Sequence, residues 1–189
     1  MNARGRRYPP PVRLFHFSDD PSIARFVPRP VTIPSARTGG RDWLNGPLVW
    51  AIDELHSPMY LFPRDCPRIL VWPVETTTPE DRELCFGATG ARIIAHVERA
   101  WWDRLSTATI HRYELPPETF TSLDDAGMHV SRDEVAPLGV EPMSDLRTAL
   151  RAAGAELRVV ESLTPLRDVW KSTLHASGIR LRNAKGWET

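Results

Sequence analysis

The segment Leu48–Arg68, LVWAIDELHSPMYLFPRDCPR, joins an apolar run to a dense group of polar side chains. Its first residues predict a buried strand, and Asp53 can cap a short helix that carries Tyr60. Two arginines, a carboxylate and a thiol follow, between prolines that restrict the backbone. An apolar strand that leads into so many reactive groups marks a candidate site.

An earlier segment, Leu14–Phe26, LFHFSDDPSIARF, has the same order of features. His16 lies inside its apolar strand, and Asp20 can cap a helix that begins at Pro21. A histidine on a strand face can hydrogen-bond a ligand hydroxyl, or it can be a packed side chain that a backbone carbonyl satisfies. The two similar segments predict two sides of one cleft.

The rest of the chain alternates short strands with short helices that do not follow each strand regularly, which favours an α+β fold. Strands are expected at 68–72, 92–97, 107–115, 128–131, 134–138 and 156–161. Helices are expected after Thr78, over 142–153 and from 164 to 178, with a long loop between 26 and 47. We predict a single α+β domain over residues 13–183, with a split antiparallel or mixed sheet and short flanking helices. A flexible arm over 1–12 and a tail over 184–189 complete the predicted organisation.

Composition limits the possible partners. The chain has 189 residues, of which 41% are hydrophobic and 25% charged, as in ordinary globular proteins. Lys plus Arg and Asp plus Glu both number 24, which argues against a nucleic-acid partner. Its apolar runs are too short to span a bilayer, so we expect no membrane partner. Cys66 and Cys85 lack the spacing of a redox or zinc pair, which indicates reduced thiols in the cytoplasm, and the scattered histidines predict no metal site.

Several side chains could contact a small-molecule or nucleotide ligand, and each has a plainer interpretation. Trp50 and Tyr60 can sandwich a planar ring or fill the core. Arg64 or Arg68 can grip a phosphate, or Arg64 can pair with Asp65 to hold the loop. Cys66 is expected to be a small buried residue, because the sequence does not locate the base that a nucleophile needs.

The order of His16, Trp50, Tyr60 and Glu134 resembles the ADP-ribosyltransferase superfamily, whose members share a small split α+β fold that binds NAD. The resemblance implies that His16 contacts the adenosine ribose and that Trp50 and Tyr60 stack on nicotinamide. It also implies that Glu134 steadies the oxocarbenium-like ribose, although strand alternation leaves open whether Asp133 or Glu134 faces inward. We therefore expect His16, Tyr60 and Glu134 to be catalytic. The expected NAD contacts are His16, Ser18, Trp50, Tyr60, Arg64 and Arg68.

Some features depart from that superfamily. Trp50 stands where the family generally has Tyr, and the chain lacks its Glu-x-Glu pair and its Ser-Thr-Ser strand. Over most of its length the chain is also similar to an uncharacterised bacterial family that carries the FPRDCPR signature, here Phe62–Arg68. The resemblance to the ADP-ribosyltransferase superfamily implies an NAD-binding ADP-ribosyltransferase or NAD glycohydrolase that uses NAD as substrate, and no metal is expected. The alternative is a non-enzymatic module that binds a nucleotide or a phosphorylated ligand.

Overall fold

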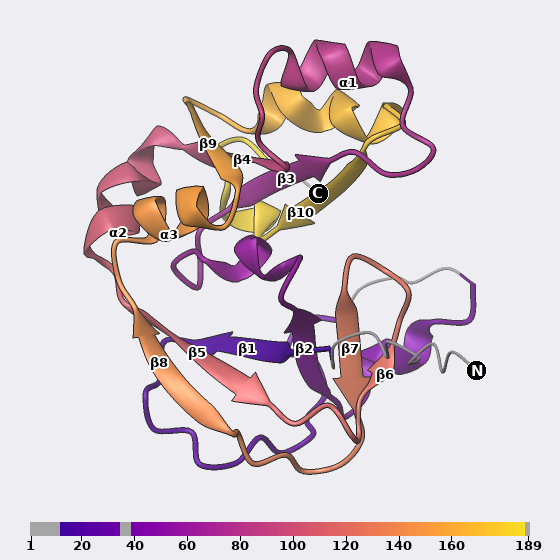
Figure 1. Cartoon of the computed structure of the whole chain (residues 1–189), viewed down its shortest axis with the longest axis vertical. Helices are drawn as coiled ribbons and strands as arrows, with labels where there is room; N and C mark the ends of the chain where they lie inside the picture. Colours follow the sequence, from indigo (N-terminus) through magenta and orange to yellow (C-terminus); the bar gives the residue numbers. More distant parts are fainter. Residues whose placement is uncertain (1–11, 35–38, 188–189) are drawn as a thin grey trace, which may run out of the picture. The chain divides into compact units, whose positions relative to one another are not determined.

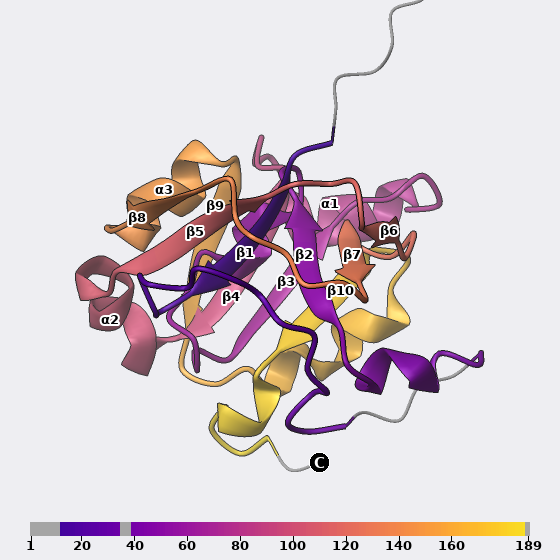
Figure 2. The same cartoon turned by 90° about the horizontal axis from the view of Figure 1, so that it is seen from below.

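The computed structural model describes residues 12–34 and 39–187 and has the predicted mixed α+β architecture (Figure 1). One sheet has six strands in the order β6 (Thr121–Ser122), β7 (Met128–Ser131), β2 (Val49–Asp53), β1 (Leu14–Ser18), β5 (Ile110–Leu115) and β8 (Gly139–Met143), and Figure 2 shows them side by side. The other has four strands in the order β10 (His175–Ile179), β3 (Arg68–Trp72), β4 (Ile93–Glu98) and β9 (Ala155–Val160). Its β4–β9 pair is parallel and its other pairs are antiparallel. The fold class is therefore confirmed.

Helical segments connect the strands. The α-helices are α1 (Pro79–Phe86), α2 (Trp102–Thr107) and α3 (Leu146–Ala152). The 3₁₀ helices cover Asp42–Asn45, Ser57–Tyr60, Arg99–Trp101, Thr164–Lys171 and Leu181–Asn183.

The contacts of the chain divide it into two compact units that interleave along the sequence. The described part of the first unit consists of residues 12–16, 23–34, 39–56 and 113–140, and that of the second consists of 17–22, 57–112 and 141–187. The predicted arm lies, up to residue 11, outside the described residues. In the predicted tail, Ala184 is buried and Trp187 packs edge-on against Trp170. Ordered packing in the second unit thus continues to Trp187.

Strand alternation organises the core of the first unit. Val49 and Ala51 of β2 join Leu14 of β1 in one buried cluster. Trp50 points to the other face, as expected for neighbouring residues of a strand, and packs against a cluster that contains Leu44. The first unit therefore has apolar contacts on both faces of β2.

The second unit is built on the four-stranded sheet. Ile69 and Ile94 on one face pack with Phe86 of α1 and with Leu163. Thr78 caps α1 by accepting a hydrogen bond from the Asp81 amide at 3.2 Å, as its sequence predicts. Helix α3 lies next to β9, and α2 contacts α3 (Figure 1).

Four local predictions were wrong. The helix expected from 164 to 178 is a 3₁₀ helix that ends at Lys171, and His175–Ile179 instead forms β10, which pairs with β3. The chain after Pro21 is not helical: the Asp20 carboxylate accepts hydrogen bonds from the amide and the hydroxyl of Ser22, and the residues from there to Phe26 have no regular secondary structure. The strand expected over 134–138 is a single bridge, between Phe26 and Val135. The helix expected from 142 begins at Leu146, because residues up to Met143 form β8.

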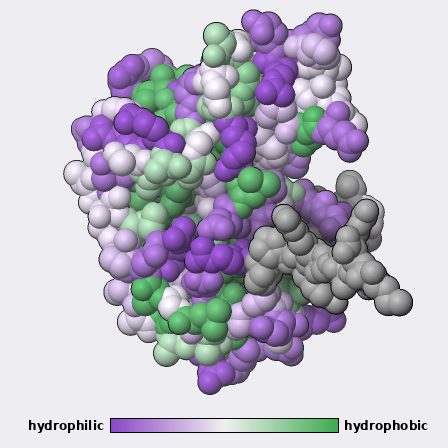
Figure 3. Space-filling model, in the orientation of Figure 1, coloured by the Kyte–Doolittle hydropathy of each residue, from purple (hydrophilic) through white to green (hydrophobic). Residues whose placement is uncertain are grey.

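Hydrophobic residues on the face in Figure 3 form separate patches among hydrophilic ones. Within residues 12–34 and 39–187, every helix is too short or too polar to cross a membrane.

Candidate functional site

A hydrogen bond to the backbone holds the ring of His16. Its Nδ1 lies 2.8 Å from the backbone carbonyl oxygen of Trp50. A carbonyl oxygen only accepts, so Nδ1 donates, and the hydrogen bond sets both the tautomer and the ring orientation. The ring is half-buried and tilted against the ring of Phe26, with 4.7 Å between centroids. The interpretation of His16 as a packed histidine that a backbone carbonyl satisfies is therefore correct for Nδ1.

Trp50 contributes its backbone to His16 but directs its ring elsewhere. His16 lies on the same face of β1 as Leu14, which packs with Val49 and Ala51. The Trp50 ring lies on the opposite face of β2, against the cluster that contains Leu44. The two side chains that were predicted to contact one ligand therefore point to opposite faces of the sheet.

Glu134 lies in the same unit as His16 and next to a shared neighbour. Phe26, whose ring contacts His16, exchanges two backbone hydrogen bonds with Val135, of 2.8 and 2.9 Å. Val135 points into the core, so Glu134 points outward, where its carboxylate lies 3.8 Å from Arg25 and is 54% exposed. Its neighbour Asp133 is exposed as well. Neither carboxylate is thus withdrawn from water.

The predicted residues of the second unit are engaged in local structure. Tyr60 ends the 3₁₀ helix Ser57–Tyr60, and its ring stacks on Phe17 with 6.2 Å between centroids. Burial raises the pKa of its hydroxyl. The Ser18 hydroxyl accepts a hydrogen bond from the Asp20 amide at 3.1 Å, and Arg64 donates to Asp19 at 3.1 Å rather than to Asp65.

Arg68 is buried, with 3% of its surface exposed. Its guanidinium donates to the carbonyl oxygens of Met59 at 2.8 Å and Cys66 at 2.9 Å, and it lies over the ring of Phe62. Burial lowers its pKa from 12.5 to about 10, which leaves it charged at neutral pH. This geometry makes Arg68 the clamp of the FPRDCPR loop.

Cys66 is fully buried inside the same loop. Burial raises the pKa of its thiol to about 12, so the reactive thiolate is scarce at neutral pH. The thiol has the environment of a packed residue rather than that of a nucleophile.

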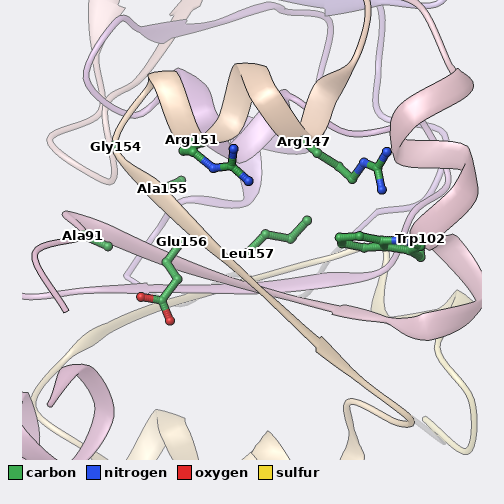
Figure 4. A pocket seen from close by; sticks show the side chains of 8 residues that line it. All are labelled: Ala91, Trp102, Arg147, Arg151, Gly154, Ala155, Glu156 and Leu157. Carbon is green, nitrogen blue, oxygen red and sulfur yellow. The ribbon is translucent and has the colours of Figure 1, made fainter. Parts of the chain in front are cut away.

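The second unit contains a pocket of about 380 Å³ that was not predicted from the sequence (Figure 4). Its signal was available, because Arg147 and Arg151 are four residues apart on a predicted helix and therefore share a face. The helix predicted over 142–153 was not assigned a role in ligand binding. The residues that line the pocket are Ala91, Trp102, Arg147, Arg151, Gly154, Ala155, Glu156 and Leu157.

These features define a mixed α+β protein with a locally fixed strand histidine in one unit and an arginine-lined pocket in the other. The chain belongs to a family of unknown function, DUF6886, whose family model matches residues 15–184. This membership agrees with the similarity to an uncharacterised family that the FPRDCPR signature carried. A search of the curated proteins found no match to the chain, and neither did a search of the solved structures.

Proposed function

We propose that this protein binds NAD and cleaves its nicotinamide glycosidic bond, as an ADP-ribosyltransferase or NAD glycohydrolase. The observation that supports the proposal best is that Phe26 contacts the ring of His16 and pairs with Val135, the residue that follows Glu134. His16 and Glu134 are far apart in the sequence, and the backbone hydrogen bonds between Phe26 and Val135 bring the segment of Glu134 next to Phe26. His16 and Glu134, in this order along the chain, correspond to the ribose contact and the carboxylate that the superfamily resemblance implies.

In the proposed reaction, His16 hydrogen-bonds a ribose hydroxyl through its oriented ring. The bond between ribose C1′ and the nicotinamide nitrogen breaks, and its electron pair leaves with neutral nicotinamide. Glu134 stabilises the positive charge that develops on the ribose. Water or an acceptor then attacks C1′ and loses its proton, which yields ADP-ribose or an ADP-ribosylated acceptor.

The proposed site keeps His16 and Glu134 from the sequence prediction and gives Trp50 a different role. The Trp50 ring lies on the face of β2 opposite to the Leu14 cluster. We therefore assign to Trp50 the role of orienting the His16 ring through its backbone carbonyl oxygen. We place the activity in the cytoplasm, where the free thiols of Cys66 and Cys85 stay reduced.

Nicotinamide release from NAD, followed by chromatography, tests the proposal. We expect Glu134→Gln to lower the rate on the order of a hundredfold, because one group that stabilises the transition state is lost. Glu118→Gln is the matched control, since Glu118 is another exposed glutamate of the same unit. Equal rates for the two variants would remove Glu134 from the mechanism, and an inactive wild-type protein would overturn the cleavage step.

A second candidate function is binding of a nucleotide without cleavage. The contact of Glu134 with Arg25 and its 54% exposure favour this candidate, because a carboxylate in water stabilises a developing charge weakly. Thermal unfolding with and without NAD distinguishes the candidates. A higher melting temperature with no nicotinamide released supports binding alone, and an unchanged melting temperature at millimolar NAD contradicts both.

A further inference from the structure

The pocket of the second unit combines an apolar floor with two cationic side chains. Residues alternate between the faces of β9, so Ala155 and Leu157 share a face and Glu156 takes the other. Figure 4 shows Leu157 on the side of α3 and the Glu156 carboxylate pointing away from it. At about 380 Å³ the pocket is near the lower end of the range of ligand pockets, about 300–1,000 Å³. It suits a compact ligand.

Arg147 and Arg151 project from the same side of α3 (Figure 4). Like charges four residues apart destabilise a helix slightly. Among the residues that the structure describes, neither guanidinium has a carboxylate oxygen within 4 Å that would offset this repulsion. The pair is therefore a source of positive charge without an ion-pair partner within 4 Å among the described residues.

The acidic groups near the pocket have other partners. Glu156 accepts a hydrogen bond from Arg158 at 2.6 Å, and a hydrogen bond from Thr89 is the largest cause of its lowered pKa. Asp145 caps α3 through the Thr148 amide, and that hydrogen bond, with the charges of the two pocket arginines, lowers the pKa of its carboxyl group. Both carboxylates are committed to local structure.

Trp102 holds one of the arginines in place. The guanidinium of Arg147 lies 4.5 Å from the centroid of the Trp102 ring. Stacking restricts the flat guanidinium and leaves its N–H groups at the edge, where an oxyanion can accept two parallel hydrogen bonds. Because Arg147 already covers this ring, recognition of a ligand relies on its anionic group rather than on an aromatic ring.

We propose that this pocket binds the phosphate or diphosphate group of a small molecule, and that Arg147 and Arg151 donate hydrogen bonds to that group. Two arginines on one helix face match a group that carries several negatively charged oxygens. All the lining residues belong to the second unit, whereas His16 and Glu134 belong to the first, so the proposal does not depend on NAD cleavage.

Isothermal titration of the full-length protein with inorganic pyrophosphate at low ionic strength tests the proposal. Pyrophosphate lacks ribose, adenine and nicotinamide, so its binding is distinguishable from the proposed binding of NAD. We expect Arg151→Gln and Arg147→Gln each to weaken binding about tenfold, the effect of losing one charge-assisted hydrogen bond. Added salt should weaken the binding by the wild-type protein as well.

Arg167→Gln is the matched control, because Arg167 also stacks on a tryptophan of the second unit, at 4.6 Å from the ring centroid of Trp187. Its affinity for pyrophosphate should equal that of the wild type. If Arg147→Gln lowers the melting temperature, Arg147→Lys replaces it in the titration. Arg147→Lys keeps the positive charge and should retain part of the affinity for pyrophosphate. The proposal is overturned if millimolar pyrophosphate does not bind or if the arginine variants bind as well as the control.

A parallel titration with ADP tests whether a nucleoside that carries the diphosphate group adds to the binding. Equal affinities for ADP and pyrophosphate indicate recognition of the diphosphate alone. Tighter binding of ADP that is lost in Arg151→Gln indicates that the nucleoside adds contacts to the same arginine site. Binding of ADP that is unchanged by both arginine substitutions contradicts the proposal.

Discussion

Replacing Arg68 by alanine should destabilise the protein far more than the same change at Arg64. Arg68 donates to the carbonyl oxygens of Met59 and Cys66, and both of these residues are buried. Its loss leaves two buried acceptors without a donor, at about 1–3 kcal/mol each, so we expect a loss of roughly 2–6 kcal/mol. Arg64 is 53% exposed and pairs with exposed Asp19, and its replacement should cost less than about 1 kcal/mol.

Urea unfolding followed by circular dichroism gives both values, provided that the slope with denaturant is unchanged. Arg68→Lys is the intermediate variant, since an ammonium group retains the charge but cannot reproduce the fixed geometry of two guanidinium bonds. We expect its stability to lie between those of the wild type and of Arg68→Ala. If Arg68→Ala costs less than about 1 kcal/mol, the loop does not depend on this clamp, and Arg68 returns to the set of candidate ligand contacts.

Three further outcomes follow from buried or strained groups. Burial, together with the charge of Arg158, lowers the pKa of His96 from 6.5 to about 4, so the unfolded chain binds the proton more tightly. Stability should fall as the pH drops from about 6.5 towards 4, by at most ~3 kcal/mol, and urea unfolding of His96→Leu should lack that fall. A thiol reagent should react with half-buried Cys85 and leave fully buried Cys66 unmodified until urea unfolds the chain, and rapid labelling of both in the native state would contradict the burial of Cys66. Gly127→Ala should lower the melting temperature, because the backbone has a φ of +69° and a Cβ would lie 2.3 Å from Nδ1 of His56. An unchanged melting temperature would show that the segment around Gly127 relaxes freely.

Local patterns in the sequence predicted the fold class and several elements with the right bounds. The strands at Arg68–Trp72 and Met128–Ser131 appear where their apolar runs indicated, and Thr78 caps α1 as predicted. Each of these signals lies within a few neighbouring residues. Short-range pattern and capping chemistry are sufficient for such elements.

Pairing over long distances decided the elements that were predicted wrongly. Asp20 and Pro21 indicate a helix start, but the chain after them has no regular secondary structure and Phe26 pairs with Val135. The sequence around Phe26 contains no sign of that partner. Pro142 read as the first turn of a helix, yet it is accommodated in β8 at the edge of the six-stranded sheet, where a missing amide is tolerated.

The candidate site was predictable only in part for the same reason. The order of His16 and Glu134 along the chain was readable, whereas their common neighbour Phe26 required the folded structure. Strand parity within β2 could have indicated that Trp50 and Ala51 face opposite ways, but not which of them shares a face with His16. Arg147 and Arg151 have helical spacing, but the position of Trp102 beside them is a tertiary contact.

NMR observation of the histidine rings during a titration with NAD tests the proposed function most directly. His129 is the internal reference, since it is another half-buried histidine of the first unit with Nδ1 at 3.0 Å from a backbone carbonyl oxygen, that of Gly127. Binding through His16 predicts a saturable shift of its ring signals, smaller or absent at His129, and loss of NAD affinity in His16→Ala. Ring signals of His16 that stay unchanged at millimolar NAD would contradict the account.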